Sequence, residues 1–164
     1  MSQPESGQSD MIQDVEDFHR KFGHGLDPKP RVLEVDLFKF RHGFHVEEIL
    51  EYAGEQLTIE EQRELGIEKS EVIIQSLNKQ LDALCDAAWV ILGTAELQFG
   101  ADRFREAWRR VAAANMAKVR SDAGVEGCMP TGRDEKFDIV KPPGWVAPDH
   151  RDLVVDYSIT RRFT

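Results

Sequence analysis

Residues 33–55 read LEVDLFKFRHGFHVEEILEYAGE, and this stretch decides the fold class of the chain. Its apolar side chains recur at three- and four-residue steps, the spacing of the buried face of an amphipathic helix: Leu33, Leu37, Phe40 and Phe44. The same period then continues in carboxylates, at Glu48, Glu51 and Glu55. Because an unpaired carboxylate is costly to bury, we expect a cationic partner to meet these acids.

Helical patterns of this kind follow one another to about residue 120. Caps, prolines and glycines between them predict helices at 10–22, 30–53, 70–99 and 102–119, joined by a charged connection at 54–69. No convincing alternation of apolar and polar residues, which would indicate a strand, occurs before residue 130. The sequence therefore predicts an all-α fold, most simply a four-helix-type bundle.

Three of these helices carry an apolar stripe of their own that we expect to face the core. The first helix has Asp10 as its N-cap and carries Ile12, Val15, Phe18 and Phe22. The longest helix carries Ile74, Leu77, Leu81, Leu84, Ala88, Ile91 and Ala95. The last helix carries Phe104, Trp108 and Val111.

The two ends of the chain differ from this helical part. Residues 1–9 are polar and contain Pro and Gly, which predicts a disordered tail. Residues 121–164 are rich in Gly and Pro, which predicts an irregular C-terminal arm or flap, with a short strand at 137–140 and a short helix at 149–156. The expected organisation is thus a helical domain at 10–120 between a tail and an arm.

Composition limits the classes of partner. The 164 residues include 21 basic and 30 acidic side chains, a formal charge of −9, which argues against binding to nucleic acid. Two cysteines are too few for a disulfide-built secreted domain, so we expect a reducing cytoplasm. No apolar run is long enough to span a membrane. We expect neither nucleic acid nor membrane as a partner.

Acids on two predicted helices form a candidate metal site. Glu48 and Glu51 share a helix face, and Glu47 precedes them. On the longest helix, Asp82 and Asp86 lie four residues apart and also share a face. Two antiparallel helices could bring four acids around one to three divalent ions, for which Mg²⁺ is favoured and Mn²⁺ is an alternative. The competing interpretation is that residues 47–55 form a solvated helix end.

The last predicted helix adds candidate substrate contacts. Asn115 and Lys118 continue its apolar stripe, and Lys141 lies in the arm. An amide can bind a base or sugar edge, and an ammonium can neutralise phosphate. The alternative is that Asn115 and Lys118 extend into solvent at a helix C-terminus, where Lys is favoured by the helix dipole.

In order and spacing, these motifs resemble the all-α nucleoside triphosphate pyrophosphohydrolases, the superfamily of MazG-like and phosphoribosyl-ATP pyrophosphohydrolase-like proteins. The resemblance covers residues 11–149 and is closest to small, often phage-encoded members. The matching pieces are Phe18-His19, Arg41-x-x-Phe44-x-x-Glu47-Glu48-x-x-Glu51, Asp82-x-x-x-Asp86, Gly93-Thr94-Ala95, Gly100, Val111-x-x-x-Asn115-x-x-Lys118 and Lys141-Pro-Pro-Gly-Trp145-x-x-Pro148-Asp149.

One half of the family signature differs here. The signature is an ExxE motif followed by an ExxD motif; Glu48 and Glu51 fit the first half. Three residues before Asp86 the chain has Ala83, and the available acid is Asp82, four residues before. This leaves open whether Asp82 would bind a metal directly or through water.

The resemblance implies an enzyme that cleaves a nucleoside triphosphate between its α- and β-phosphates, giving a nucleoside monophosphate and pyrophosphate. It implies that Glu48, Glu51, Asp82 and Asp86 hold Mg²⁺ and that Glu47 is the general base. Asn115, Lys118 and Lys141 would contact the nucleotide. It also implies a homodimer or homotetramer. The alternative function is a non-catalytic helical module, an oligomeric scaffold or nucleotide sensor of the same fold.

Overall fold

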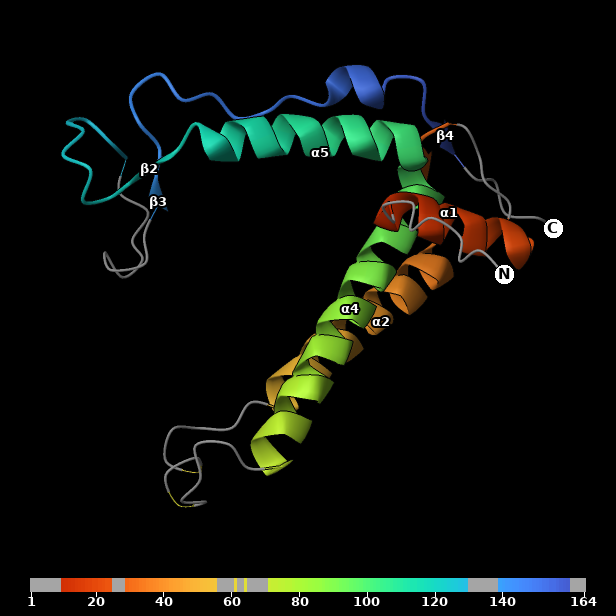
Figure 1. Cartoon of the computed structure of the whole chain (residues 1–164). Helices are drawn as coiled ribbons and strands as arrows, with labels where there is room; N and C mark the ends of the chain where they lie inside the picture. The colour runs from red at the N-terminus through yellow and green to blue at the C-terminus, as the bar shows by residue number, and fades with distance from the viewer. Residues whose placement is uncertain are drawn as a thin grey trace, which may run out of the picture. The chain divides into compact units, whose positions relative to one another are not determined.

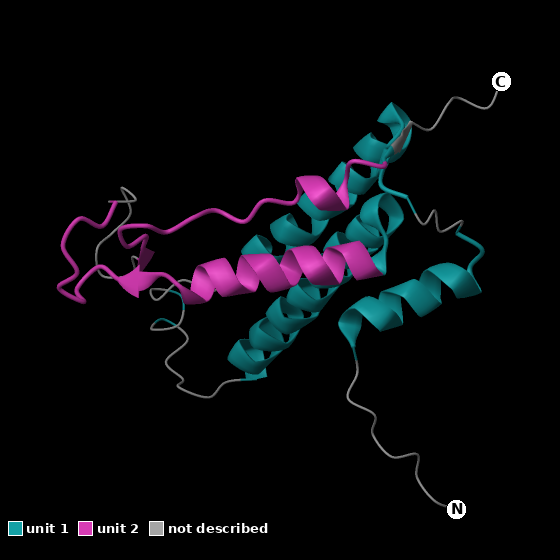
Figure 2. Cartoon of the chain, turned by 90° about the horizontal axis from the view of Figure 1, so that it is seen from above, with its two compact units in different colours: residues 1–101, 157–164 teal, residues 102–156 magenta. Residues whose placement is uncertain are grey.

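The computed structural model describes residues 10–24, 29–55, 61, 64, 71–129 and 139–159. It divides into two compact units, residues 1–101 with 157–164 and residues 102–156 (Figure 2). The expected tail at residues 1–9 and most of the connection at 54–69 lie outside the described residues. The predicted domain boundary near residue 120 falls within the second unit, and the proposed division there stays a prediction.

The first unit is built from α1 (Met11–Lys21), α2 (Val35–Gly54) and α4 (Glu71–Phe99). Both α1 and α2 pack against α4, and α2 and α4 lie side by side along much of their length (Figure 1). Two-residue strands β1 (Arg31–Val32) and β4 (Ser158–Ile159) pair in parallel, with Arg31 opposite Ser158. The all-α class is thereby confirmed, while the four-helix bundle stays a prediction.

Helix α1 begins as the sequence predicts, because the Asp10 side chain accepts a hydrogen bond from the backbone N–H of Ile12. Its core differs from the prediction. Val15 is fully buried, but Phe18 and Phe22 are exposed, and His19 is buried in their place. The helix therefore turns a face centred on Val15 and His19 toward α4.

Helix α2 begins at Val35, later than the predicted start near residue 30, because Arg31 and Val32 pair with β4 instead. Leu33 consequently lies outside the helix. Phe40 is 59% exposed, so the predicted stripe is only partly a core face. The helix ends at Gly54, close to the predicted end at 53.

Helix α4 has the predicted bounds but buries a different face. The expected stripe is largely exposed, with Leu81 at 64%, and its other exposed members are Ile74, Leu77, Leu84 and Ile91. The buried positions are mostly small: Ser76, Ala83, Ala87, Val90, Gly93, Ala95 and Glu96. Small side chains let a neighbouring helix approach closely, so the face that packs is not the face with the largest side chains. Of the predicted stripe, Ala95 is buried.

The second unit is organised around α5 (Ala101–Met116), which follows α4 after Gly100. Gly100 has φ +79°, a left-handed conformation that favours glycine and ends the helix. Strands β2 (Val119–Arg120) and β3 (Ile139–Val140) pair antiparallel, with Val119 opposite Val140. The short helix predicted at 149–156 is the single 3₁₀ turn η2 (Arg151–Leu153). Trp108 of the predicted stripe is exposed.

The irregular segment after β3 runs along α5 and is fixed to it by polar contacts (Figure 1). The Arg110 guanidinium donates to both carboxylate oxygens of Asp152, at 2.6 and 2.7 Å, and to the backbone oxygen of Asp149. The indole N–H of Trp145 donates to the backbone oxygen of Ala114 at 2.7 Å. The segment is therefore a strap along α5.

Among the described residues, no helix has the length and apolar character needed to cross a membrane.

Candidate functional site

Four acids predicted to hold a metal, together with the predicted general base Glu47, lie on two packed helices of the first unit. Glu47, Glu48 and Glu51 project from α2, and Asp82 and Asp86 from α4. The pKa of Glu48 is raised, first by the partial burial of its carboxyl and then by repulsion from Glu51, Asp86, Glu47 and Asp82, in that order. The other four carboxylates therefore all lie close enough to Glu48 to repel it.

These five carboxylates have no cationic partner in the described part of the chain. Among the described residues, Glu55 differs from them, because its carboxylate binds the ammonium of Lys79 at 3.0 Å. No group of three or more acidic, His or Cys side chains among the described residues is close enough to hold a metal ion. Like charges separate when nothing neutralises them. The two helices thus bring the acids into one region, but the described carboxylates do not surround a single metal position.

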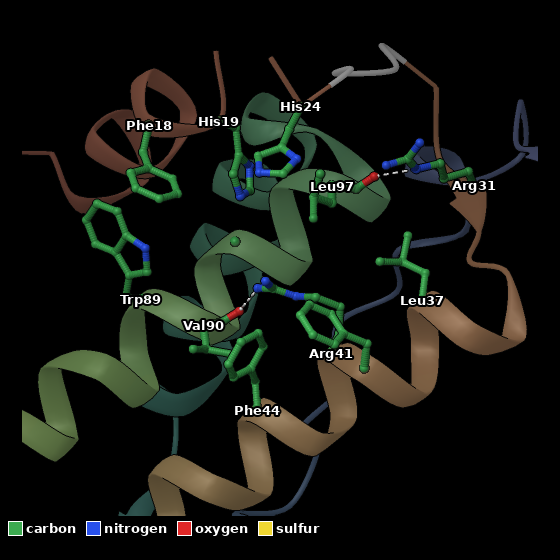
Figure 3. A pocket seen from close by; sticks show the side chains of 12 residues that line it. Phe18, His19, His24, Arg31, Leu37, Arg41, Phe44, Trp89, Val90 and Leu97 are labelled. Carbon is green, nitrogen blue, oxygen red and sulfur yellow. Dashed lines mark hydrogen bonds between the residues drawn. The ribbon is translucent and has the colours of Figure 1, made fainter. Parts of the chain in front are cut away.

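An open cavity of about 600 Å³ lies beside α1, α2 and α4 in the same unit (Figure 3). Its aromatic walls come from all three helices: Phe18, Phe40, Phe44 and Trp89. Phe18 and Trp89 meet edge to face, with ring centres 5.4 Å apart. Such walls offer contact surface to a planar apolar group.

His19 and Glu96 form a buried pair at the edge of this cavity. They are 4% and 3% exposed, and the Nδ1 atom of His19 is hydrogen-bonded to Oε2 of Glu96. A buried carboxylate needs such a partner. Sequence motifs alone do not assign a role to His19. The available signal was Glu96, an acid in the apolar half of the longest helix.

Arg41 lines the same cavity from α2. Its Nε donates to Oγ1 of Thr94 at 2.9 Å, and its Nη2 donates to the backbone oxygen of Val90 at 2.7 Å (Figure 3). Burial lowers the pKa of the guanidinium. In the ranges that the structure describes, no carboxylate pairs with it. A partly desolvated cation without an anion therefore faces a cavity with aromatic walls.

Because Gly93 has no side chain, Arg41 and His19 can both approach α4 at this position. A Cβ built on Gly93 would lie 2.8 Å from Nη2 of Arg41 and 3.4 Å from Nε2 of His19. The first separation is shorter than real Cβ contacts allow, so a side chain here would displace the guanidinium. Gly93, quoted above only as part of a motif, thus leaves space for two polar groups at one point of the cavity.

The predicted substrate-binding residues Asn115, Lys118 and Lys141 belong to the second unit. The ammonium of Lys118 lies 5.8 Å, and that of Lys141 4.5 Å, from the centre of the Trp145 ring. Lys118 precedes Val119 and Lys141 follows Val140, so the pairing of these two valines brings both lysines to the same end of the β2–β3 pair. Asn115 is exposed, and its backbone oxygen accepts from the N–H of Lys118.

Lys118 and Lys141 therefore form a pair of like charges on one indole. Like charges held near each other repel, and within the described residues neither lysine has a carboxylate partner. The structure thus brings two of the three predicted contact residues together and leaves their charge uncompensated.

No protein-family model matches this chain, and no curated protein matches it. Family membership consequently stays an expectation drawn from the motifs.

Proposed function

We propose that this protein is a metal-dependent nucleoside triphosphate pyrophosphohydrolase of the all-α type. The observation that carries the proposal is that four carboxylates from two separate helices gather around Glu48, without a basic partner in the described part of the chain. A merely solvated helix end would not need acids from a second helix at the same place. Mutual repulsion is a cost that a bound cation removes.

The donor set suits Mg²⁺, because carboxylate oxygens are the ligands that hard divalent cations prefer. Glu48, Glu51 and Asp86 would hold the ion, with Asp82 binding directly or through water. When bound, Mg²⁺ neutralises charge on phosphoryl oxygens and makes a bound water more acidic. The buried Ala83 could not be replaced by an acid without burying that charge, which explains why the second acid stands at position 82.

The chain's own groups supply the remaining roles. Glu47 is exposed beside the metal-binding acids, and its carboxylate accepts the proton of the attacking water. The water oxygen bonds to phosphorus as the α–β anhydride bond breaks, which gives a nucleoside monophosphate and pyrophosphate. Lys118 and Lys141 neutralise phosphate oxygens, and Asn115 contacts the nucleotide. The aromatic cavity in the first unit receives the planar base.

The proposal includes assembly of the chain as a homodimer or homotetramer. Large apolar side chains on α4, among them Leu77, Leu81 and Leu84, are exposed in the single chain. A row of exposed leucines along one helix is typical of an association surface. Light scattering should report a mass of two or four chains, and a monomer at micromolar concentration would contradict this part of the proposal.

The function is tested by following products. Purified protein with Mg²⁺ and a panel of nucleoside triphosphates should release one pyrophosphate for each monophosphate formed, as measured by phosphorus NMR. A chelator should stop the release, and added Mg²⁺ or Mn²⁺ should restore it. Release of single phosphates, or of no product from any nucleotide, would overturn the proposal.

The second candidate is a non-catalytic nucleotide sensor of the same fold. It is favoured by one observation, that no group in the described residues closes around a metal position. A sensor would bind nucleotide without changing it, so the phosphorus spectrum distinguishes the two functions.

A further inference from the structure

We propose that the cavity of the first unit selects bases whose ring carries a carbonyl next to an N–H, the lactam edge of guanine, hypoxanthine, uracil and thymine. Arg41 donates to the carbonyl, and Nε2 of His19 accepts from the ring N–H. This inference rests on the proposed function only in taking the ligand to be a nucleotide.

Glu96 determines what His19 offers to the cavity. A carboxylate only accepts hydrogen bonds, so the bond between Glu96 and Nδ1 of His19 assigns the imidazole proton to Nδ1. In the neutral ring, Nε2 is then an acceptor. Both partners are buried, which holds the ring in one orientation. His19 therefore presents a fixed acceptor.

Arg41 offers the complementary group. Its Nε and one hydrogen of Nη2 are used by Thr94 and the backbone of Val90. A guanidinium has five N–H donors in a planar fork. Three donors, on Nη1 and Nη2, thus remain after these bonds. Because the two bonds anchor the fork on α4, the remaining donors have a fixed place as well.

The acceptor and the donor lie at the same point of the cavity. Nη2 of Arg41 and Nε2 of His19 are 2.8 and 3.4 Å from the position that a Cβ of Gly93 would take. Figure 3 shows both side chains directed toward this turn of α4, with the aromatic side chains around them. A ligand that stacks on these aromatic walls would meet a donor and an acceptor side by side.

Adjacent donor and acceptor groups distinguish two classes of base. Guanine, hypoxanthine, uracil and thymine have a carbonyl acceptor beside a ring N–H donor, which matches Arg41 and His19. Adenine and cytosine have an amino donor beside a ring nitrogen acceptor, so their polarity is reversed. A reversed base would leave both the buried His19 and the partly buried Arg41 unpaired, which a polar site rejects strongly.

The sharpest test compares inosine and adenosine monophosphates, which differ in this edge. Calorimetry of the full chain without metal should show inosine monophosphate binding at least about tenfold more tightly than adenosine monophosphate. The Arg41→Lys variant, which keeps the charge but loses the fork, should reduce this preference to below about threefold. Arg20→Lys is the matched control, since Arg20 is an exposed residue paired with Glu16, and should keep the preference.

Failure of this inference differs from failure of the proposed function. Equal binding of the two monophosphates, preference for the adenine nucleotide, or binding of neither would overturn it, and the wild-type comparison gives this answer even if Arg41→Lys does not fold. A preference for inosine monophosphate in a protein that hydrolyses no triphosphate would support the inference and overturn the hydrolase. If hydrolysis occurs, inosine triphosphate should exceed adenosine triphosphate in kcat/KM by a similar factor.

Discussion

The acidic residues around Glu48 on α2 and α4 lie among other acids, whereas those on α5 and its strap are paired with arginines. Partial burial of Glu48, and then repulsion from the four carboxylates around it, raises the pKa of this residue. On α5, hydrogen bonds from Arg109 and then Arg110 lower the pKa of Glu106 to about 2. Arg110 likewise lowers the pKa of Asp152, which lies on the strap.

The difference separates two uses of charged residues. Paired charges on α5 fix a segment that has little regular structure of its own. The five acids on α2 and α4 have no cationic partner among the described residues, and this lack of a partner is the basis of the proposed metal site. Lys118 and Lys141 carry charge of the opposite sign, and they belong to the second unit, where most of the other charged residues that the structure describes are paired.

The largest effect should come from removing one unpaired acid. Glu48→Gln should lower kcat for pyrophosphate release by about 100- to 1000-fold, because a charge-stabilising contact in the transition state is lost. Initial rates at saturating Mg²⁺ measure this. Glu126→Gln, at an exposed acid of the second unit, is the control and should leave the rate unchanged. A Glu48→Gln enzyme of normal rate would remove the basis for a catalytic acid cluster.

A smaller effect is expected from the lysine pair. Lys141→Gln should raise KM for the triphosphate by roughly tenfold with less change in kcat, because one ammonium no longer neutralises phosphate. Steady-state kinetics separate the two constants. Lys39→Gln, at an exposed lysine of α2, serves as the control. An unchanged KM would show that the pair on Trp145 does not meet substrate.

The strap should loosen in acid. The folded pKa of Glu106 is about 2, below its ordinary value of 4.5, so its stabilising contribution is fully present above the ordinary value and is lost as pH falls toward about 2. Asp152 changes in the same direction from its ordinary value of 3.8. The indole N–H resonance of Trp145, assigned with Trp145→Phe, should shift toward that of an exposed indole between about pH 4 and pH 2.

The Arg110→Lys variant sharpens the same measurement, because it replaces the two-pronged contact with Asp152 by a single ammonium. Its Trp145 resonance should shift at a higher pH than in the wild type. Identical titrations of the two proteins would mean that Arg110 does not hold the strap.

The smallest expected effect is on stability: Glu48→Gln, which should lower the catalytic rate, should raise the melting temperature. Without divalent metal, Glu48→Gln should raise the melting temperature by roughly 2 °C, because it removes mutual repulsion. The raised pKa of Glu48 implies that wild-type stability decreases as pH rises through its folded pKa, and the variant should lack this decrease. Added Mg²⁺ should stabilise the wild type more than the variant. A lower melting temperature in the variant would show that Glu48 stabilises the fold.

Local signals in the sequence were sufficient for the helices themselves. Asp10 has the chemistry of an N-cap and acts as one. Gly100 punctuates a long helical pattern and has the left-handed conformation that ends it. The sequence predicts the acids by the same local means, since helical periodicity alone places Glu48 and Glu51 on one face of α2 and Asp82 and Asp86 on one face of α4.

Features that depend on long-range packing could not be predicted in this way. Periodicity finds a stripe of large apolar residues on α4, but the choice between Leu81 and Ala83 as the packed position depends on how closely α2 approaches. The start of α2 depends on the pairing of Arg31 with Ser158. The bond between His19 and Glu96 joins residues 77 positions apart, and no local pattern relates them.

The parallel pairing of β1 with β4 has a consequence for synthesis. A ribosome makes the chain from its N-terminus, and early segments generally fold first. Here Arg31 and Val32 are translated before the whole of the second unit, and their partners Ser158 and Ile159 are translated after it. The first unit can therefore be completed only after the second unit has been translated, and a nascent chain stalled in the second unit would still lack the β4 strand of the first.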